Sequence, residues 1–152
     1  MALESVLAYL HLLAILTMVV FLASEAALCR GEWLNAQAVA RLARVDTLYG
    51  IAALAVLATG AARIAWGIKG PGHYGGNWLL HLKVGLFALV GLASIRPTLT
   101  FRRWARELRA GGPLPGADAV RATRRLVMLQ AHLVPLIPLA ATFLARGFGA
   151  KG

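Results

Sequence analysis

The sequence predicts an all-α protein, a bundle of four transmembrane helices in one membrane. Hydrophobic residues make up 59% of the 152 positions and charged residues only 14%, and the mean hydropathy is +0.69. An ordinary soluble domain is less apolar than this. The apolar residues also fall into four separate runs, each close to the roughly 20 residues that a spanning helix needs. Backbone groups in lipid must be paired within their own segment, so these runs are helices and not strands.

The four predicted spans cover about residues 3–27, 48–68, 77–99 and 126–148. No repeat or low-complexity linker divides them, so the chain is predicted to be a single domain, 1–152. The first run lacks a preceding basic segment and is longer than the apolar part of a secretory signal, which favours a retained span. Pro135 and Pro138 predict a kink in the fourth span. His132, one turn earlier, is expected to donate a hydrogen bond to a carbonyl that the kink frees.

Basic residues are concentrated in two of the three connections, and they predict the orientation. The net charge is +10, and the first and third connections hold most of the arginines: Arg30, Arg41 and Arg44, then Arg102, Arg103, Arg106, Arg109, Arg121, Arg124 and Arg125. The positive-inside rule places these connections in the cytoplasm and both termini outside, in the periplasm of a Gram-negative cell. The arginines are expected to bind anionic lipid head groups, and an interfacial helix is predicted around Trp104. The arginines are clustered between apolar runs, and this pattern does not favour nucleic-acid binding.

Four ionisable side chains are predicted to reach one level in the outer half of the membrane. Converted at 1.5 Å per residue, His11, Arg63, His81 and Lys83 lie roughly 6–10 Å below the outer surface. Ionisable residues inside a span are functional candidates because they are expensive to keep there. Their excess positive charge favours an anionic partner, such as a haem propionate, a quinone oxygen, a carboxylate or a lipid phosphate. The glycine-rich loop 69–76 is predicted to lie over this site as a lid.

Polar residues at the cytoplasmic ends of the spans have a structural interpretation. Glu25, Asp46, Arg44 and Arg96 are predicted to pair with one another as scaffold, with a proton path as the less favoured alternative. The single cysteine, Cys29, excludes an internal disulfide and is predicted to be a plain thiol at the membrane interface.

Several strings resemble one bacterial family of small integral membrane proteins that has no assigned function. The longest string is His81-Leu82-Lys83, continuing through Leu86-Phe87-Ala88-Leu89-Val90-Gly91 to Ser94-Ile95-Arg96-Pro97-Thr98. Others are Tyr9-Leu10-His11, Arg41-Leu42-Ala43-Arg44-Val45-Asp46, Leu48-Tyr49-Gly50, Ala58-Thr59-Gly60 with Arg63, and Ala145-Arg146-Gly147. The resemblance covers nearly the whole chain and implies a four-helix membrane protein. At Gln130 the family pattern leads us to expect an acid.

A histidine in the first span and Trp78-Leu79-Leu80-His81-Leu82-Lys83 at the start of the third are similar to HemJ-type protoporphyrinogen oxidases and CopD-like membrane domains. The resemblance implies a helical bundle with b-type haem, in which His11 and His81 match the function-bearing histidines and Lys83 the lysine that follows. This sequence has one more residue between tryptophan and histidine than the HemJ pattern. It also lacks the Asn-Glu-Val-Pro string.

The leading hypothesis is therefore a multi-pass protein of the bacterial inner membrane that binds haem b and has redox activity. Whether the protein is an enzyme is left open. His11 and His81 would ligate the iron, and Arg63 and Lys83 would hold propionates, another tetrapyrrole or a quinone. Four aromatic side chains would line or cap the site, namely Tyr9, Trp66, Tyr74 and Trp78, although aromatic residues at these depths more often belong to the interfacial belt. One alternative is a non-enzymatic module that binds or transports a metal ion or a small anion. Another is a structural accessory subunit, and self-association into a homo-oligomer is left open.

Overall fold

The computed structural model describes residues 1–66, 76 and 78–146, except for the side chains of 144 and 145. These residues form helices and no strand. In chain order the elements are α1 (Ala2–Leu28), the short 3-10 helix η1 (Gly31–Trp33), α2 (Ala36–Trp66), α4 (Trp78–Arg109), α5 (Ala117–Leu133) and α6 (Leu136–Ala145). Within the described part of the chain, four helical stretches are long and apolar enough to cross a membrane, α5 and α6 together forming the fourth. The predicted fold class is confirmed.

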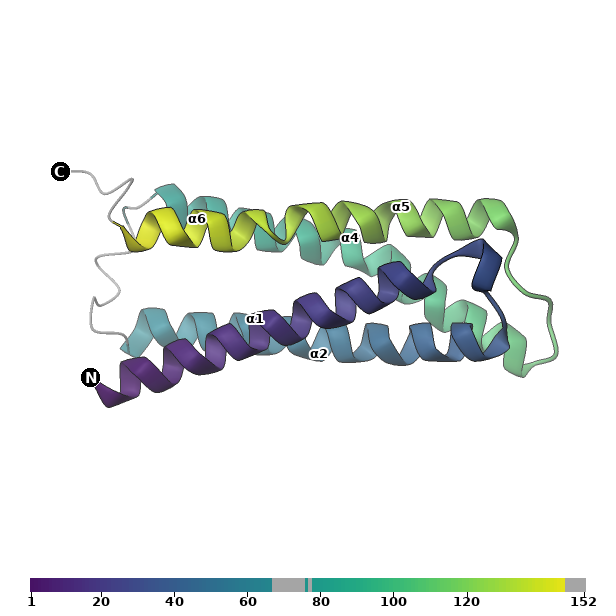
Figure 1. Ribbon diagram of the computed structural model, residues 1–152, viewed down its shortest axis with the longest axis horizontal. Coiled ribbons are helices and arrows are strands. Elements are labelled where there is room, and N and C mark those ends of the chain that lie inside the picture. The colour runs from purple at the N-terminus through teal and green to yellow at the C-terminus, as the bar shows by residue number, and fades with distance from the viewer. Residues whose placement is uncertain (67–75, 77, 147–152) are drawn as a thin grey trace.

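The helices run up and down in one elongated bundle (Figure 1). α1 packs chiefly along α2, α4 packs against α2, α5 and α6, and α5 completes the bundle against α1. The connections α1–α2 and α4–α5 lie at one end, which we call the arginine end. The N-terminus, the last turns of α2 and α6 and the first turn of α4 lie at the opposite, terminal end. Both arginine-rich connections therefore lie at the same end of the bundle, as predicted. Which side of the membrane this end faces stays a prediction.

The helices extend further at the arginine end than the apolar runs indicate. α2 begins at Ala36, about three turns before the predicted span, and α4 continues through Pro97 to Arg109. Arginine and alanine are good helix formers, so the helices persist after the apolar run ends. The helix predicted around Trp104 is present, but it is the continuation of α4, and its interfacial position stays a prediction. Trp104 belongs to α4 and is buried, and its ring meets that of Phe101 edge to face, with centroids 5.8 Å apart.

The fourth span is interrupted where the prolines predict a kink. α5 ends at Leu133 and α6 begins at Leu136, because Pro135 has no backbone N–H to continue the helical bonding. Pro138 falls in the first turn of α6, where a missing donor is tolerated. His132 lies 2.6 Å from the Met128 carbonyl oxygen through Nδ1. His132 therefore contacts a backbone carbonyl, but the predicted acceptor is wrong: Met128 lies four residues earlier in α5, and its carbonyl is not the one that Pro135 frees.

The bundle interior is filled by side chains from every long helix, including Met18, Leu42, Phe101 and Val127. Large apolar side chains also cover the outside. On α1 alone Leu12, Leu16 and Val20 are each more than half exposed, as expected for a surface that faces lipid. Cys29, by contrast, is fully buried. The prediction of an interfacial thiol is wrong because the turn after α1 folds inward against α5, where the Cys29 Sγ lies 4.0 Å from the Val120 carbonyl oxygen.

Candidate functional site

Ionisable residues follow a seven-residue spacing along the face of α1 that packs on α2. Glu4, His11, Met18 and Glu25 occupy this stripe, and the last three are buried. A seven-residue interval returns a helix to nearly the same direction, so these side chains share one seam. Met18 is apolar, and it separates a polar cluster at the terminal end from another at the arginine end. The sequence contained this spacing, but reasoning from depth alone missed it.

The terminal cluster is organised around His11. This imidazole is 5% exposed, and its Nδ1 lies 2.8 Å from the Thr59 hydroxyl oxygen. Thr59 in turn donates to the Ala55 carbonyl at 2.7 Å, as a helical threonine commonly does. Gly60, the next residue, lets α1 approach closely, since a Cβ there would lie only 3.2 Å from the His11 Cε1. These contacts fix both the position and the direction of the ring.

Arg63 and Lys83 add two cations at the same end. Arg63 of α2 forms an ion pair with Glu4 of α1, its Nη2 lying 3.5 Å from Oε1. Lys83 of α4 is partly buried and lies within electrostatic range of Arg63 and His11. The structure thus brings together three of the four predicted site residues, His11, Arg63 and Lys83.

Two polar atoms in this cluster are buried without a hydrogen-bond partner among the described residues. They are Nε2 of His11 and Nε of Arg63. A buried polar atom that lacks a partner is destabilising, by about 1–3 kcal/mol. Such atoms are rare in native proteins, and a bound ligand is one explanation for them. The terminal cluster therefore has two unused hydrogen-bonding positions close to two positive charges.

His81 does not join the cluster. It is exposed on α4, on a different side of the helix from Lys83, because residues two apart point in different directions. Depth along the helix was therefore an incomplete guide, since residues at one level can face opposite ways.

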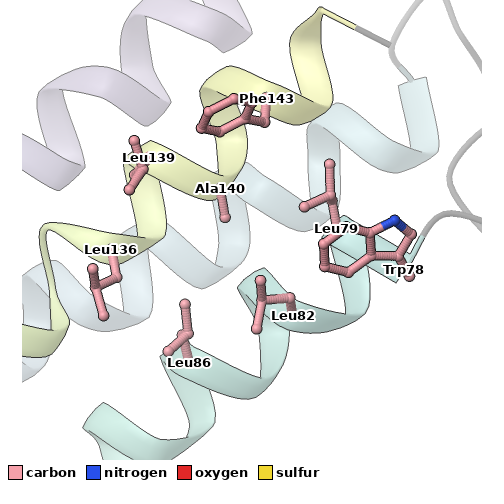
Figure 2. A pocket seen from close by; sticks show the side chains of 8 residues that line it. All are labelled: Trp78, Leu79, Leu82, Leu86, Leu136, Leu139, Ala140 and Phe143. Atoms are coloured by element: carbon pink, nitrogen blue, oxygen red, sulfur yellow. The ribbon is translucent and has the colours of Figure 1, made fainter. Parts of the chain in front are cut away.

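The aromatic residues predicted to line the site lie on the outside. Tyr9, Trp66 and Trp78 are each at least 59% exposed, an arrangement typical of the aromatic belt at a membrane interface. Tyr74, together with His73 and most of the predicted lid 69–76, lies outside the described residues. Trp78 instead borders a groove of about 460 Å³ between α4 and α6, which Figure 2 shows to be lined by apolar side chains such as Leu82 and Leu139.

The described residues do not fit a haem held between His11 and His81. One imidazole is buried against Gly60 and Thr59 of α2, and the other is exposed on α4. A bis-histidine haem needs two imidazoles that point at each other across a flat space. The groove between α4 and α6 has a volume of about 460 Å³, but neither histidine lines it. We derive no chemistry through haem from this geometry.

The second polar cluster, at the arginine end, consists of carboxyl groups. Glu25 of α1 is 0% exposed and Asp46 of α2 is 3% exposed, and the two side chains contact each other across the seam. The predicted ion pairing with Arg44 and Arg96 is wrong: both arginines are exposed, and no salt bridge of Glu25 or Asp46 occurs in the described part of the chain. Arginine reaches water from these helix positions, whereas the shorter acids point inward.

Polar side chains of other helices complete the arginine-end cluster. Thr98 of α4 donates to Asp46 Oδ1 at 3.0 Å. The Tyr49 hydroxyl donates to Oε1 of Gln130 at 2.9 Å, which joins α2 to α5. Gln130 is fully buried, so the residue at which the family resemblance suggested an acid serves here as a neutral acceptor.

A family described as "Predicted membrane protein (DUF2214)" matches residues 3–149. The chain belongs to this family. The match spans both polar clusters and all of the described helices except the first residue of α1. No curated protein and no solved structure matches the chain. Membership establishes a membrane protein of unknown function, and the likeness to HemJ-type and CopD-like proteins stays a prediction.

Proposed function

We propose that this family member is a membrane-embedded module that binds a small oxyanion, a carboxylate or a phosphate, at the terminal cluster. The observation that carries the proposal is the pair of buried, unpartnered atoms, His11 Nε2 and Arg63 Nε, next to Lys83. The Nε–H of Arg63 is a donor. His11 Nε2 becomes a donor when the imidazole proton lies on it, in which case the Thr59 hydroxyl donates to Nδ1 instead of to the Ala55 carbonyl.

The balance of charge favours an anion over a cation. Arg63 and Lys83 carry two positive charges within electrostatic range of each other, and Glu4 supplies one carboxylate to this group. Lys83 has no hydrogen bond or ion pair within the described residues. Placing an oxyanion among these groups would offset the repulsion between the two cations and would accept from the free donors. A divalent metal ion would meet repulsion at the same place.

The proposed site lies in apolar surroundings inside the bundle, so a ligand must leave water to reach it. His11 is almost completely buried, and the next buried side chains of α1 towards the arginine end, Met18 and Leu22, are apolar and each 2% exposed. Electrostatic attraction is stronger in a poorly hydrated setting than in water. The site is therefore suited to hold one charged group, whether this belongs to a soluble anion or to the head group of a lipid.

Thermal unfolding of the detergent-purified protein tests the proposal. Titration with sodium phosphate and sodium acetate, against sodium chloride at equal ionic strength, should raise the Tm of the wild type. A ligand present at 100 times its Kd stabilises the folded state by about 2.7 kcal/mol. Lys83→Met should abolish the ligand-dependent rise, and Arg41→Gln, which removes an exposed arginine at the other end, should leave it unchanged.

The two sources of anion are separated by native mass spectrometry. Copurified phosphatidylglycerol that is lost in Lys83→Met would identify a lipid head group, and a saturable Tm shift with free phosphate or acetate would identify a soluble anion. Equal behaviour of wild type and Lys83→Met in both measurements would refute the proposal.

A haem that uses His11, but not His81, as a protein ligand is a second proposal, and the observation that favours it is the His11 ring itself. Its Nδ1 is fixed by Thr59 while Nε2 is unpartnered, as in many metal-ligating histidines. An absorption spectrum of the purified protein, before and after dithionite, tests this directly. A Soret band that disappears in His11→Ala would support haem; a featureless spectrum after incubation with hemin would exclude it.

A further inference from the structure

The carboxyl groups of Glu25 and Asp46 form the most deeply buried ionisable pair in the described part of the chain, and the proposed anion site does not use them. They lie at the arginine end of the seam, 14 residues along α1 from His11, or about 21 Å. Met18 and Leu22 of α1 and Val56 of α2 lie between the two clusters and are apolar and buried. The pair is therefore a separate site with its own chemistry.

Neither side-chain oxygen of Glu25 has a hydrogen-bond partner among the described residues, although the residue is 0% exposed. The donors nearby are already engaged. Thr98 donates to Asp46, and the Tyr49 hydroxyl donates to Gln130. The Arg124 guanidinium of α5 donates to the carbonyls of Ala26 and Cys29.

The charged groups around the pair do not neutralise it. Arg102 of α4 attracts Asp46 electrostatically, but its side chain is exposed, so water screens the attraction. Arg124 of α5 is hydrogen-bonded to backbone carbonyls. The Cys29 thiol and the Tyr49 hydroxyl carry no charge near neutral pH. Two ionised carboxylates in contact here would repel each other in a poorly hydrated interior.

Two carboxyl groups in contact can form a hydrogen bond only when a proton lies between them, because ionised carboxylates accept and do not donate. We propose that the Glu25–Asp46 pair is a proton-binding site, in which one proton is shared between a carboxylic acid and a carboxylate. Protonation supplies the missing donor, removes one of two like charges and engages one of the two unpartnered oxygens of Glu25. The pair then titrates as a unit.

A proton fits the arrangement better than a metal cation does. A sodium or calcium ion requires several further oxygen ligands. The Thr98 hydroxyl already donates to Asp46, and the backbone carbonyls of α1 and α2 are used within the helices. The described residues contain no group of three or more acidic, histidine or cysteine side chains that could hold a metal ion.

Dicyclohexylcarbodiimide tests the proposal on the full chain in detergent, because it reacts with protonated carboxyl groups in apolar surroundings. We expect peptide mapping to find the adduct on Glu25 or Asp46 at neutral pH, with less adduct as the pH rises. Glu32 and Glu107, which are exposed, serve as internal controls and should remain unmodified. Glu25→Gln should remove the adduct from the seam.

Infrared spectroscopy of the wild type gives a readout that needs no variant to fold. The proposal predicts a carboxylic-acid C=O band at neutral pH that shifts in D₂O and disappears at high pH, and Asp46→Asn should alter it. Absence of this band in the wild type would overturn the proposal. Protection from the carbodiimide by sodium chloride, but not by choline chloride at equal ionic strength, would overturn it in favour of a sodium site. Neither result depends on anion binding at Lys83.

Discussion

The His11 imidazole of α1 lies against Gly60 of α2, so closely that a Cβ atom at position 60 would be 3.2 Å from the ring's Cε1. The adjacent ring atom, Nδ1, lies 2.8 Å from the Thr59 hydroxyl oxygen. Two consecutive residues of α2 therefore position one buried histidine, the first by leaving room and the second by hydrogen bonding. Membrane helices commonly approach each other at such small residues.

Gly60→Ala should destabilise the protein or displace the His11 ring. The added methyl group must move the imidazole by a few tenths of an ångström, and overpacking of this kind typically costs about 1–3 kcal/mol. Thermal unfolding in detergent measures the effect. Gly50→Ala is the matched control on the same helix, because a Cβ there meets nothing within 4 Å. Equal melting temperatures for the two variants would contradict the close packing of His11.

Thr59→Val should weaken the bundle more than Thr59→Ser. Valine keeps the shape of threonine but leaves His11 Nδ1 without its partner, whereas serine keeps the hydroxyl. The loss of a partner for a buried polar atom is worth about 1–3 kcal/mol. Denaturant unfolding of both variants in the same detergent provides the comparison. If valine and serine gave the same stability, the hydrogen bond would have no net value in the folded state.

The fold could be predicted from the sequence because lipid imposes strong constraints. Four apolar runs, the arginine-rich connections and Pro135 were enough to predict four helices, their up-and-down order and the break between α5 and α6. The helix ends at the arginine side were missed. Apolarity indicates where the membrane ends, but Arg102 and Arg106 lie on a helix that continues beyond that point.

The terminal cluster was predicted only in part, because depth along a helix does not give direction around it. His11, Arg63 and Lys83 converge, but His81 lies on the exposed side of α4. Ion pairs with arginines were predicted for Glu25 and Asp46, because arginines lie close to the two acids in the sequence. Only the three-dimensional structure shows that Glu25 turns inward to Asp46 while Arg44 and Arg96 remain outside.

Arg124 should contribute more to stability than its neighbour Arg125. Its guanidinium donates to the carbonyls of Ala26 and Cys29 at the C-terminal end of α1, where helical carbonyls lack partners and a cation is favoured. Arg124→Gln should therefore lower the free energy of unfolding by about 1–2 kcal/mol. Arg125→Gln removes the same charge from an exposed position and should have little effect. Comparable losses in the two variants would indicate that only net charge matters.

The Cys29 thiol should react slowly with maleimide in the folded protein. Burial raises its pKa to about 11 from an ordinary value of 9.0, so the reactive thiolate is scarce at neutral pH. The unfolded chain ionises first as the pH rises, and the free energy of unfolding should therefore decrease between pH 9.0 and about 11 and be unaffected by this group below that range. Mass spectrometry of maleimide-treated protein, folded and then denatured, measures the difference. The double variant Cys29→Ser, Glu32→Cys carries a thiol at an exposed position a few residues away and should react quickly in both states. Rapid reaction of Cys29 in the folded wild type would show that the turn after α1 opens readily, which would contradict its inward packing against α5.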